Sequence, residues 1–530
     1  MTKLALIGEV VTMSSHDDVR ESVIWEGERI TVAGSASDVL GDREVAPLTA
    51  ARDICVVPGF IDPHVHLDGT PVERPLDDCS SKADLLDRVA GLVRRAGAGE
   101  WCVARGSIDG ADLWPTRADL DRVAPANPVF VSSGFTGVAN SMALAAAGIG
   151  RLSPPPAAGY VGKDGDGQPD GVLSDLAIRA IDKVAPAGTE SMYDRLARGT
   201  RNLAQAGITS AHQIVNTASV VRAFTELRSA GELPVRMGFL FKAYGHATRL
   251  DSLLNLGLST GFGDDWMKVQ GVKFLFDGGY PQGAMRYPGA SRYDAQAVFR
   301  TPPPLLWEMV DQAHASGLRC AVHANGAQAV DLALDAFEYA LSRHPRDDHR
   351  HRIEHAANTP MSPARIARMK ALGLVAVPNP PILFRKLASL REDAADSGSA
   401  PVNIRDFLAA GAPVAVGSDY AGVYPVEPLA SIAELVTRRA TGQVRPQERL
   451  TPWEALGLYT ATGAWLGFEE GRKGKLLPGF LADFTVLSAN PLTCPPDELE
   501  KVRVLGTVVG GRPRYWSADL GPAPVGAGQR

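Results

Sequence analysis

Short runs of apolar residues recur along the chain, each bounded by glycine, proline or polar residues and most followed by a segment with helical periodicity. This alternation predicts repeated strand-helix units. Eight such runs lie at residues 56–64, 207–212, 235–241, 271–276, 318–323, 352–355, 374–377 and 413–419. Eight parallel strands with intervening helices close into a TIM (β/α)8 barrel, so the pattern predicts an α/β protein of this class.

Local signals after two of these runs indicate where helices begin and end. Ser362-Pro363 offers an N-cap followed by proline at the first helical position, and Gly373 follows the last apolar residue of that segment. Thr451 and Glu454 have the spacing of a capping box. We therefore predict helices after the sixth and eighth strands.

The chain of 530 residues is long enough to bury a barrel core and still form a second, smaller domain. Strand-like runs also occur towards both ends, at residues 4–12, 22–31, 484–487 and 502–509. Residues from about 68 to about 200 separate the first two barrel strands and are far longer than an ordinary connection, which predicts a large insertion. Residues 517–530 are rich in proline, glycine and alanine, and we expect a flexible tail there.

Composition narrows the choice of partner. The formal net charge is −6 and lysine and arginine do not cluster, which argues against a nucleic-acid surface. No apolar run reaches the length that spans a bilayer, and the five cysteines lack metal-ligand spacing. We expect a cytoplasmic protein that binds a small molecule and neither nucleic acid nor a membrane. For the oligomeric state, a homodimer is the alternative to a monomer.

Candidate metal ligands occur at the ends of the predicted strands, where barrel active sites lie. His64 and His66 form a His-X-His pair whose strand alternation points both imidazoles the same way. His323, His355 and Asp419 end the fifth, sixth and eighth strands. Neutral imidazoles with a carboxylate suit zinc, so this order of residues predicts a metal site.

These motifs resemble those of the amidohydrolase superfamily, and the resemblance covers nearly the whole chain. The segments that carry it are Pro58-Gly59-Phe60-Ile61-Asp62-Pro63-His64-Val65-His66, Val272-Lys273-Phe274, Arg352-Ile353-Glu354-His355 and Gly417-Ser418-Asp419. The details are most similar to the long-chain branch, amidohydrolase family 3, to which N-substituted formamide deformylases belong. The branch usually has an aspartate where this chain has Ala327, so substrate identity stays open.

The resemblance implies a domain organisation and a ligand set. It implies a small β-sandwich built from residues 1–55 with 470–516, beside a barrel over residues 56–469. It also implies that the metal ligands are His64, His66, Lys273, His323, His355 and Asp419, and that they hold one or two Zn²⁺ ions or another divalent metal.

Lys273 needs a separate argument because an ammonium cannot bind a metal. Burial beside cations favours the neutral amine, which can add carbon dioxide to form a carbamate. Several amidohydrolases use a carbamylated lysine to bridge two metals. The alternatives for Lys273 are an ordinary salt bridge and a site with a single metal.

Asp419 has two interpretations. The resemblance makes it the catalytic residue that accepts a proton from water and returns it to the departing nitrogen, and the alternative is a helix cap.

The function implied is a metal-dependent hydrolase that cleaves a C–N bond of an amide-like small molecule through a metal-activated hydroxide. Alternatives are a cyclic-amide, lactone or amino-heterocycle hydrolase on the same barrel, and a non-catalytic interaction protein. His212 ends the second predicted strand and either faces the metals or supports the site, and Asp277 lies in a predicted turn. The candidate groups for binding substrate or supporting the ligands are His212, Trp114, Phe135, Asn140, Asp277, Tyr280 and Arg286.

Overall fold

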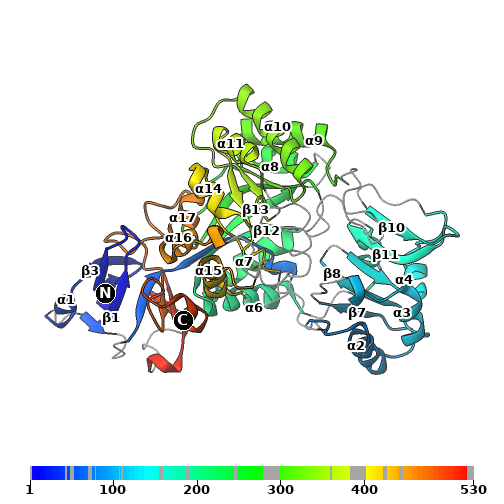
Figure 1. Cartoon of the computed structure of the whole chain (residues 1–530), viewed down its shortest axis with the longest axis horizontal. Helices are drawn as coiled ribbons and strands as arrows, with labels where there is room; N and C mark the ends of the chain where they lie inside the picture. Colours follow the sequence, from blue (N-terminus) through cyan, green and yellow to red (C-terminus); the bar gives the residue numbers. More distant parts are fainter. Residues whose placement is uncertain are drawn as a thin grey trace.

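The computed structural model of the chain describes residues 3–41, 45–47, 53–69, 75–77, 79–106, 108, 111–134, 136–153, 159–175, 177–186, 190–243, 248–277, 299–358, 361–381, 402–421, 426–440 and 446–521. Three bodies of secondary structure are visible in Figure 1. A curled parallel sheet with its helices lies in the middle, strands from both ends of the chain lie on one side of it, and the insertion lies on the other.

The central sheet contains seven parallel strands among the described residues, and neighbours in the sheet follow the order of the chain. They are β6 (Phe60–Val65), β12 (Ile208–Val215), β13 (Arg236–Ala243), β14 (Met267–Leu275), β15 (Cys320–His323), β16 (Arg352–Glu354) and β17 (Val375–Val377). The eighth predicted strand is a segment that pairs Val414 with Ala376 of β17 and Tyr420 with Val65 of β6. One segment therefore contacts both edges of the curled sheet.

The prediction of a single strand over residues 56–64 is wrong at Gly59. Residues before it form β5 (Cys55–Pro58), which pairs with strands of the terminal sheet, whereas β6 pairs with β12 in the central sheet. A Cβ at Gly59 would lie 2.2 Å from the side chain of Thr209, so the backbone passes too close to β12 for any larger residue. An apolar run alone does not reveal this change of sheet.

Helices follow the strands as the periodicity predicted. The local signals are confirmed in two of them: Ser362 caps α11 by accepting from the Arg365 amide at 3.3 Å, and Thr451 and Glu454 form the capping box of α16. The helices that belong to the central sheet are α6 (Met192–Gln205), α7 (Ala218–Ser229), α8 (Thr248–Asn255), α9 (Pro303–Ala315), α10 (Ala327–Arg343), α11 (Pro363–Ala371), α14 (Ile404–Ala410), α15 (Pro428–Thr437), α16 (Pro452–Leu458) and α17 (Ala461–Leu466).

The largest apolar core lies between these helices and the central sheet. In α10, Val330, Leu334 and Phe337 recur on one face and are fully buried. Burying an apolar side chain contributes about 1.5–3 kcal/mol, so this face anchors the helix that follows β15. This packing fixes the position of α10 against the sheet, and with it the end of β15.

Strands from both ends of the chain share a second sheet. It contains β1 (Lys3–Val11), β2 (Val19–Glu26), β3 (Arg29–Gly34), β4 (Val45–Pro47), β5, β18 (Phe484–Leu487), β19 (Val504–Val509) and β20 (Arg512–Trp516), with the short helix α1 (Ala36–Leu40) beside it. Trp25 packs edge-on against Phe484, with ring centroids 5.0 Å apart, and ties the two ends together. The sandwich arrangement of this sheet stays a prediction.

The expected flexible tail begins too early at residue 517. Ala518–Leu520 forms a short 3-10 helix capped by Ser517, and Leu520 is buried against the core of the terminal sheet. Residues 522–530 lie outside the described residues. One apolar side chain in a Pro/Gly-rich segment is enough to hold this turn in place.

The insertion forms its own five-stranded sheet in the order β10-β11-β9-β8-β7. Its strands are β7 (Cys102–Arg105), β8 (Val129–Ser133), β9 (Thr136–Ala139), β10 (Gly159–Lys163) and β11 (Pro169–Asp175), and its helices are α2 (Lys82–Arg95), α3 (Arg117–Val123), α4 (Ser141–Ala146) and α5 (Ile178–Asp182). Two apolar clusters lie within it. Across the described parts of all three bodies, no helix is both long and apolar enough to cross a bilayer.

Candidate metal centre

Three candidate ligand atoms converge where β6 ends. The Nε2 atoms of His64 and His66 lie 3.2 Å apart, and Oδ1 of Asp419 lies 3.4 Å from the first and 3.3 Å from the second. His64 is the next-to-last residue of β6, His66 directly follows the strand, and Asp419 comes from the segment that pairs with it. Two imidazole nitrogens and a carboxylate oxygen that face one point are the donor set that zinc prefers.

Two further histidines extend this group across the sheet. The ring of His355 lies 5.0 Å from that of His64, and the ring of His323 lies 4.4 Å from that of His355, measured between centroids. His323 ends β15 and His355 follows β16, so these residues and His64 all lie at carboxyl ends of strands in the central sheet. All three rings are at least 95 % buried.

The backbone at two of the candidate ligands is unusual. His355 has φ of +71° and Asp419 has φ of +56°, in the left-handed region that few residues other than glycine occupy. Hydrogen bonds hold both amides: His355 donates to the Val377 carbonyl at 2.9 Å, and Asp419 donates to the His64 carbonyl at 3.0 Å. Strained backbone of this kind concentrates at functional sites.

A buried carboxylate fixes the orientation of His64. Nδ1 of His64 contacts Glu354, and Glu354 also contacts the guanidinium of Arg352. Burial and the charge of Lys273 lower the pKa of His64 to about 3 in spite of Glu354, so the imidazole is neutral near neutral pH. A neutral ring that donates from Nδ1 to Glu354 leaves Nε2 free to bind a metal.

Two other polar side chains, Asn379 and Asp62, hold the residues around the candidate ligands. Asn379 accepts from Nδ1 of His355 at 2.7 Å, which leaves Nε2 of that ring unprotonated as well. Asp62 accepts from the amides of His64 at 3.1 Å and Ser418 at 3.0 Å, and burial raises its pKa to about 6. Asp62 thereby joins the first strand to the segment that carries Asp419.

Lys273 lies on β14 with its side chain buried, and its Nζ has no hydrogen-bond partner among the residues that the structure describes. Burial lowers the pKa of Lys273 to about 7 although Glu354 opposes the shift. A large fraction of the side chain is then a neutral amine near pH 7. In the described part of the chain no carboxylate oxygen lies within ion-pair distance of Nζ, so no salt bridge of the kind considered from the sequence is present among these residues.

The carboxyl of Asp419 stays ionised. Burial would raise its pKa, but the hydrogen bond to His66 and the nearby His64 and His355 outweigh that effect and keep the pKa well below its usual range. An anionic oxygen beside neutral imidazoles is the form in which an aspartate binds a metal.

The structure gives distinct positions to the other predicted residues of the central sheet. His212 is buried within β12, and its Nδ1 lies 3.3 Å from Nη1 of Arg352. Through this nitrogen His212 contacts the Arg352–Glu354 pair and not a candidate ligand atom. Asp277 accepts from the amides of Asn325 at 3.0 Å and Gly326 at 2.8 Å. Its Oδ1 lies 3.5 Å from Nε2 of His323, and burial raises its pKa to about 7.

Two predicted residues of the insertion have structural partners. Asn140 is fully buried, caps α4 by accepting from the Ala143 amide at 2.9 Å, and donates to the Asn127 carbonyl at 2.8 Å. Its amide is therefore committed to the insertion and is a poor candidate for binding substrate. Trp114 packs against an apolar cluster of the insertion. Phe135, Tyr280 and Arg286 lie outside the described residues.

Sequence reasoning missed the groups that orient the ligands. Glu354 stands one residue before His355 and Asp62 stands two residues before His64, so both were visible as acidic residues inside predicted buried strands. A buried carboxylate needs a partner, and that rule would have singled them out. Asn379 follows β17 and has no comparable signal in the sequence.

Together the curled parallel sheet and the histidines and aspartate at its strand ends define an α/β protein with a candidate metal centre. The sequence profile of the amidohydrolase family matches residues 49–515, and the chain belongs to that family. This confirms the resemblance found in the motifs, and with it the expectation of an enzyme that hydrolyses carbon–nitrogen bonds other than peptide bonds.

Known relatives cover almost the whole chain. It is 28% identical to N-substituted formamide deformylase of Arthrobacter pascens, over 96% of this chain and 97% of that protein. It is 29% identical to the putative amidohydrolase YtcJ of Bacillus subtilis (strain 168), over 96% and 98% respectively. The crystal structure of an uncharacterized metal-dependent hydrolase from Pyrococcus furiosus superposes with a TM-score of 0.66 at 26% identity, covering 93% of this chain and 100% of that one.

Proposed function

We propose that this protein is a metal-dependent hydrolase that cleaves the C–N bond of a small linear or N-substituted amide. The observation that carries the proposal is the convergence of His64, His66 and Asp419 within hydrogen-bonding distances at one strand end. The similarity to an N-substituted formamide deformylase supports the substrate class.

The donor set fits a divalent cation, and zinc in particular. His64, His66, His323, His355 and Asp419 would hold it, since the imidazoles of His64 and His355 are neutral and oriented through Nδ1. A divalent cation bound there would act as a Lewis acid that lowers the pKa of water and polarises the amide carbonyl.

Asp419 has the position of a proton carrier. Its side chain is 39% exposed, whereas His64 beside it is fully buried, so one face of the carboxylate is open to a substrate and water. In hydrolysis the oxygen of water adds to the carbonyl carbon and the C–N bond breaks. Asp419 accepts the proton that water loses and delivers it to the departing nitrogen, so acid and amine leave in balance.

Lys273 is proposed to carry a carbamate and to complete a site for two cations. Its buried Nζ lacks a hydrogen-bond partner in the described part of the chain, and its pKa is lowered to about 7. The nitrogen of the neutral amine bonds to the carbon of carbon dioxide and releases one proton, which gives a carbamate whose single negative charge is shared by two oxygen donors. That change would supply the ligand that a lysine ammonium cannot be.

The remaining expectations accompany this proposal. A complete (β/α)8 barrel is supported by the segment that pairs with both edges of the central sheet. We also propose a small-molecule partner, no nucleic-acid or membrane partner, a cytoplasmic location and, if the protein associates, a homodimer.

The test combines metal analysis with a substrate screen. Purified protein is analysed for zinc and other divalent metals, then assayed on N-formyl, N-acyl and cyclic amides, lactones and amino-heterocycles, with Asp419→Asn as the inactive control. Amide cleavage that depends on bound metal supports the proposal. Full activity in metal-free protein would overturn the mechanism, and deamination of a heterocycle without amide cleavage would replace the function.

A further inference from the structure

A cavity of about 290 Å³ opens at the opposite end of the central sheet from the candidate metal centre. Its lining comes from the amino-terminal ends of three strands: Lys268 near the start of β14, Arg319 directly before β15 and His349 shortly before β16. The candidate ligands Lys273, His323 and His355 lie at the other ends of these strands. This cavity is therefore separate from the hydrolytic site.

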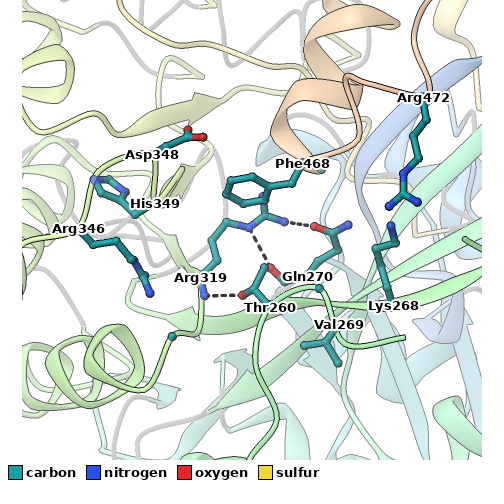
Figure 2. A pocket seen from close by; sticks show the side chains of 13 residues that line it. Thr260, Lys268, Val269, Gln270, Arg319, Arg346, Asp348, His349, Phe468 and Arg472 are labelled. Atoms are coloured by element: carbon teal, nitrogen blue, oxygen red, sulfur yellow. Dashed lines mark hydrogen bonds between the residues drawn. The ribbon is translucent and has the colours of Figure 1, made fainter. Parts of the chain in front are cut away.

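Cationic side chains dominate the lining. Lys268 and Arg472 lie on one side of Arg319, and Arg346 and His349 lie on the other (Figure 2). Asp348 is the one acidic residue among the residues that line this cavity. The wall therefore carries four groups that are positive at neutral pH and a single carboxylate.

Part of this charge is already compensated. Nζ of Lys268 lies 2.6 Å from a carboxylate oxygen of Glu469, and Nη1 of Arg472 lies 2.5 Å from one of Asp265. The carboxylate of Asp348 is bound at 2.7 Å by Arg350, which does not line the cavity, so it is not available to the other cations.

Arg319 and Arg346 have no carboxylate within ion-pair distance among the described residues. The guanidinium of Arg319 donates to the Gln270 carbonyl at 2.9 Å and also to the Leu466 carbonyl and to Oε1 of Gln270, all of them uncharged acceptors. It lies 5.3 Å from the ring centre of Phe468 (Figure 2). Arg346 donates to Nδ1 of His314 at 2.9 Å and to the carbonyls of His314 and Leu318 at 3.3 Å each, and its buried Nε has no hydrogen-bond partner in the described part of the chain.

A guanidinium stays charged in a protein, and a charge removed from water without a counterion is costly. Arg319 is only 1% exposed, so water compensates little of its charge. Two such groups at one open cavity make a site in which an anion would gain charge-assisted hydrogen bonds, because the planar guanidinium matches carboxylate and phosphate oxygens.

We propose that this cavity is a binding site for a small oxyanion, a carboxylate or a phosphate group, held between Arg319 and Arg346. The cavity volume is at the lower end of the range for small-molecule sites, which fits an ion or a short organic acid. Phe468 offers the adjoining apolar surface for the carbon part of such an acid. The proposal concerns binding alone and does not depend on the hydrolytic activity.

Calorimetric titration of the metal-containing enzyme with inorganic phosphate, and separately with succinate, tests this site. Binding by either probe supports it, and the better probe identifies the source of the oxyanion. Arg346→Gln should weaken binding by about tenfold or more, since a charged hydrogen bond contributes about 1.5–3 kcal/mol. Arg503→Gln, at an exposed arginine paired with Asp519, is the matched control and should bind like the parent protein.

Two results would overturn the proposal: no saturable binding of either probe, or unchanged binding in a folded Arg346→Gln variant. The second result would place the anion elsewhere, for example at the metal centre. If Arg346→Gln does not fold, crystals of the parent enzyme soaked in selenate decide the question. Anomalous density between Arg319 and Arg346 supports the site, and selenate bound only elsewhere refutes it.

Discussion

The substitution Glu354→Gln tests whether a buried carboxylate controls the candidate metal centre. Glu354 is fully buried, contacts Nδ1 of His64 and is held by the equally buried Arg352. Arg352 also donates to the Pro63 carbonyl at 2.7 Å and contacts His212. Glutamine keeps the size of the side chain and one oxygen acceptor, but it removes the negative charge that pairs with Arg352 and leaves a single oxygen to accept from both neighbours.

Two magnitudes follow from these contacts. Removing one partner of a buried ion pair costs about 3–5 kcal/mol because the other charge stays buried, and the remaining bonds of Arg352 favour the lower end. Loss of a group that orients a ligand histidine weakens metal affinity by about 10–100-fold. The free energy of unfolding of the metal-free protein should fall by about 3 kcal/mol, and the metal dissociation constant should rise by at least about tenfold.

Glu454→Gln is the matched control. Glu454 also binds an arginine through two contacts, to Arg405 at 2.7 Å each, but both side chains are about 30% exposed and lie outside the candidate centre. A partly exposed pair contributes about 0–1 kcal/mol, and glutamine still serves in a capping box. Denaturant unfolding and competition with a metal chelator measure both quantities. Unchanged metal affinity in Glu354→Gln would refute the orienting role of Glu354.

Lys273→Ala should lose one metal ion and most of its turnover, and small carboxylic acids should restore part of it by standing in for the carbamate; unchanged metal content and activity would exclude that role. Asp419→Asn should retain the fold and lower turnover by about a hundredfold or more, and an unaltered rate would remove it from proton transfer. Burial lowers the pKa of His349 to about 4. Because this folded-state pKa lies below the unfolded value of about 6.5, the contribution of His349 is present above pH 6.5 and is lost as pH falls towards 4, by up to about 3 kcal/mol. Unfolding measured against pH should show a shallower slope in His349→Gln and no change in the exposed His16→Gln, and equal slopes in all three proteins would contradict the assignment.

The sequence predicted the order of the parallel strands because a buried strand needs a continuous apolar run whatever its neighbours are. It did not predict that the first run changes sheet at Gly59, because the cause is the approach of Thr209 from a strand far along the chain. The sequence also did not predict that Leu520, which follows the last strand, is buried, since a single apolar residue gives no periodicity. Local patterns report burial, whereas sheet membership depends on distant partners.

The same limit applies to the candidate site. The strand-end positions of His64, His66 and Asp419 follow from alternation and chain order, and the structure brings these residues together. The positive φ angles of His355 and Asp419 do not follow, because non-glycine residues adopt them only when surrounding contacts impose them. The capping role of Asn140 does not follow either, because an asparagine that could bind substrate and one that caps a helix look alike until the helix is seen.

The polar interior of the central sheet connects these observations. Arg352 and Glu354 on β16, with His212 on β12, occupy positions that an apolar core would fill with valine or leucine. Such groups are costly to bury unless they are paired, and each of the three contacts another of them or a candidate ligand. Satisfied networks of this kind rigidify their surroundings. The position of His64 is therefore set by charges inside the sheet as well as by the end of its strand, which is why a carboxylate one residue before His355 matters to a ligand on β6.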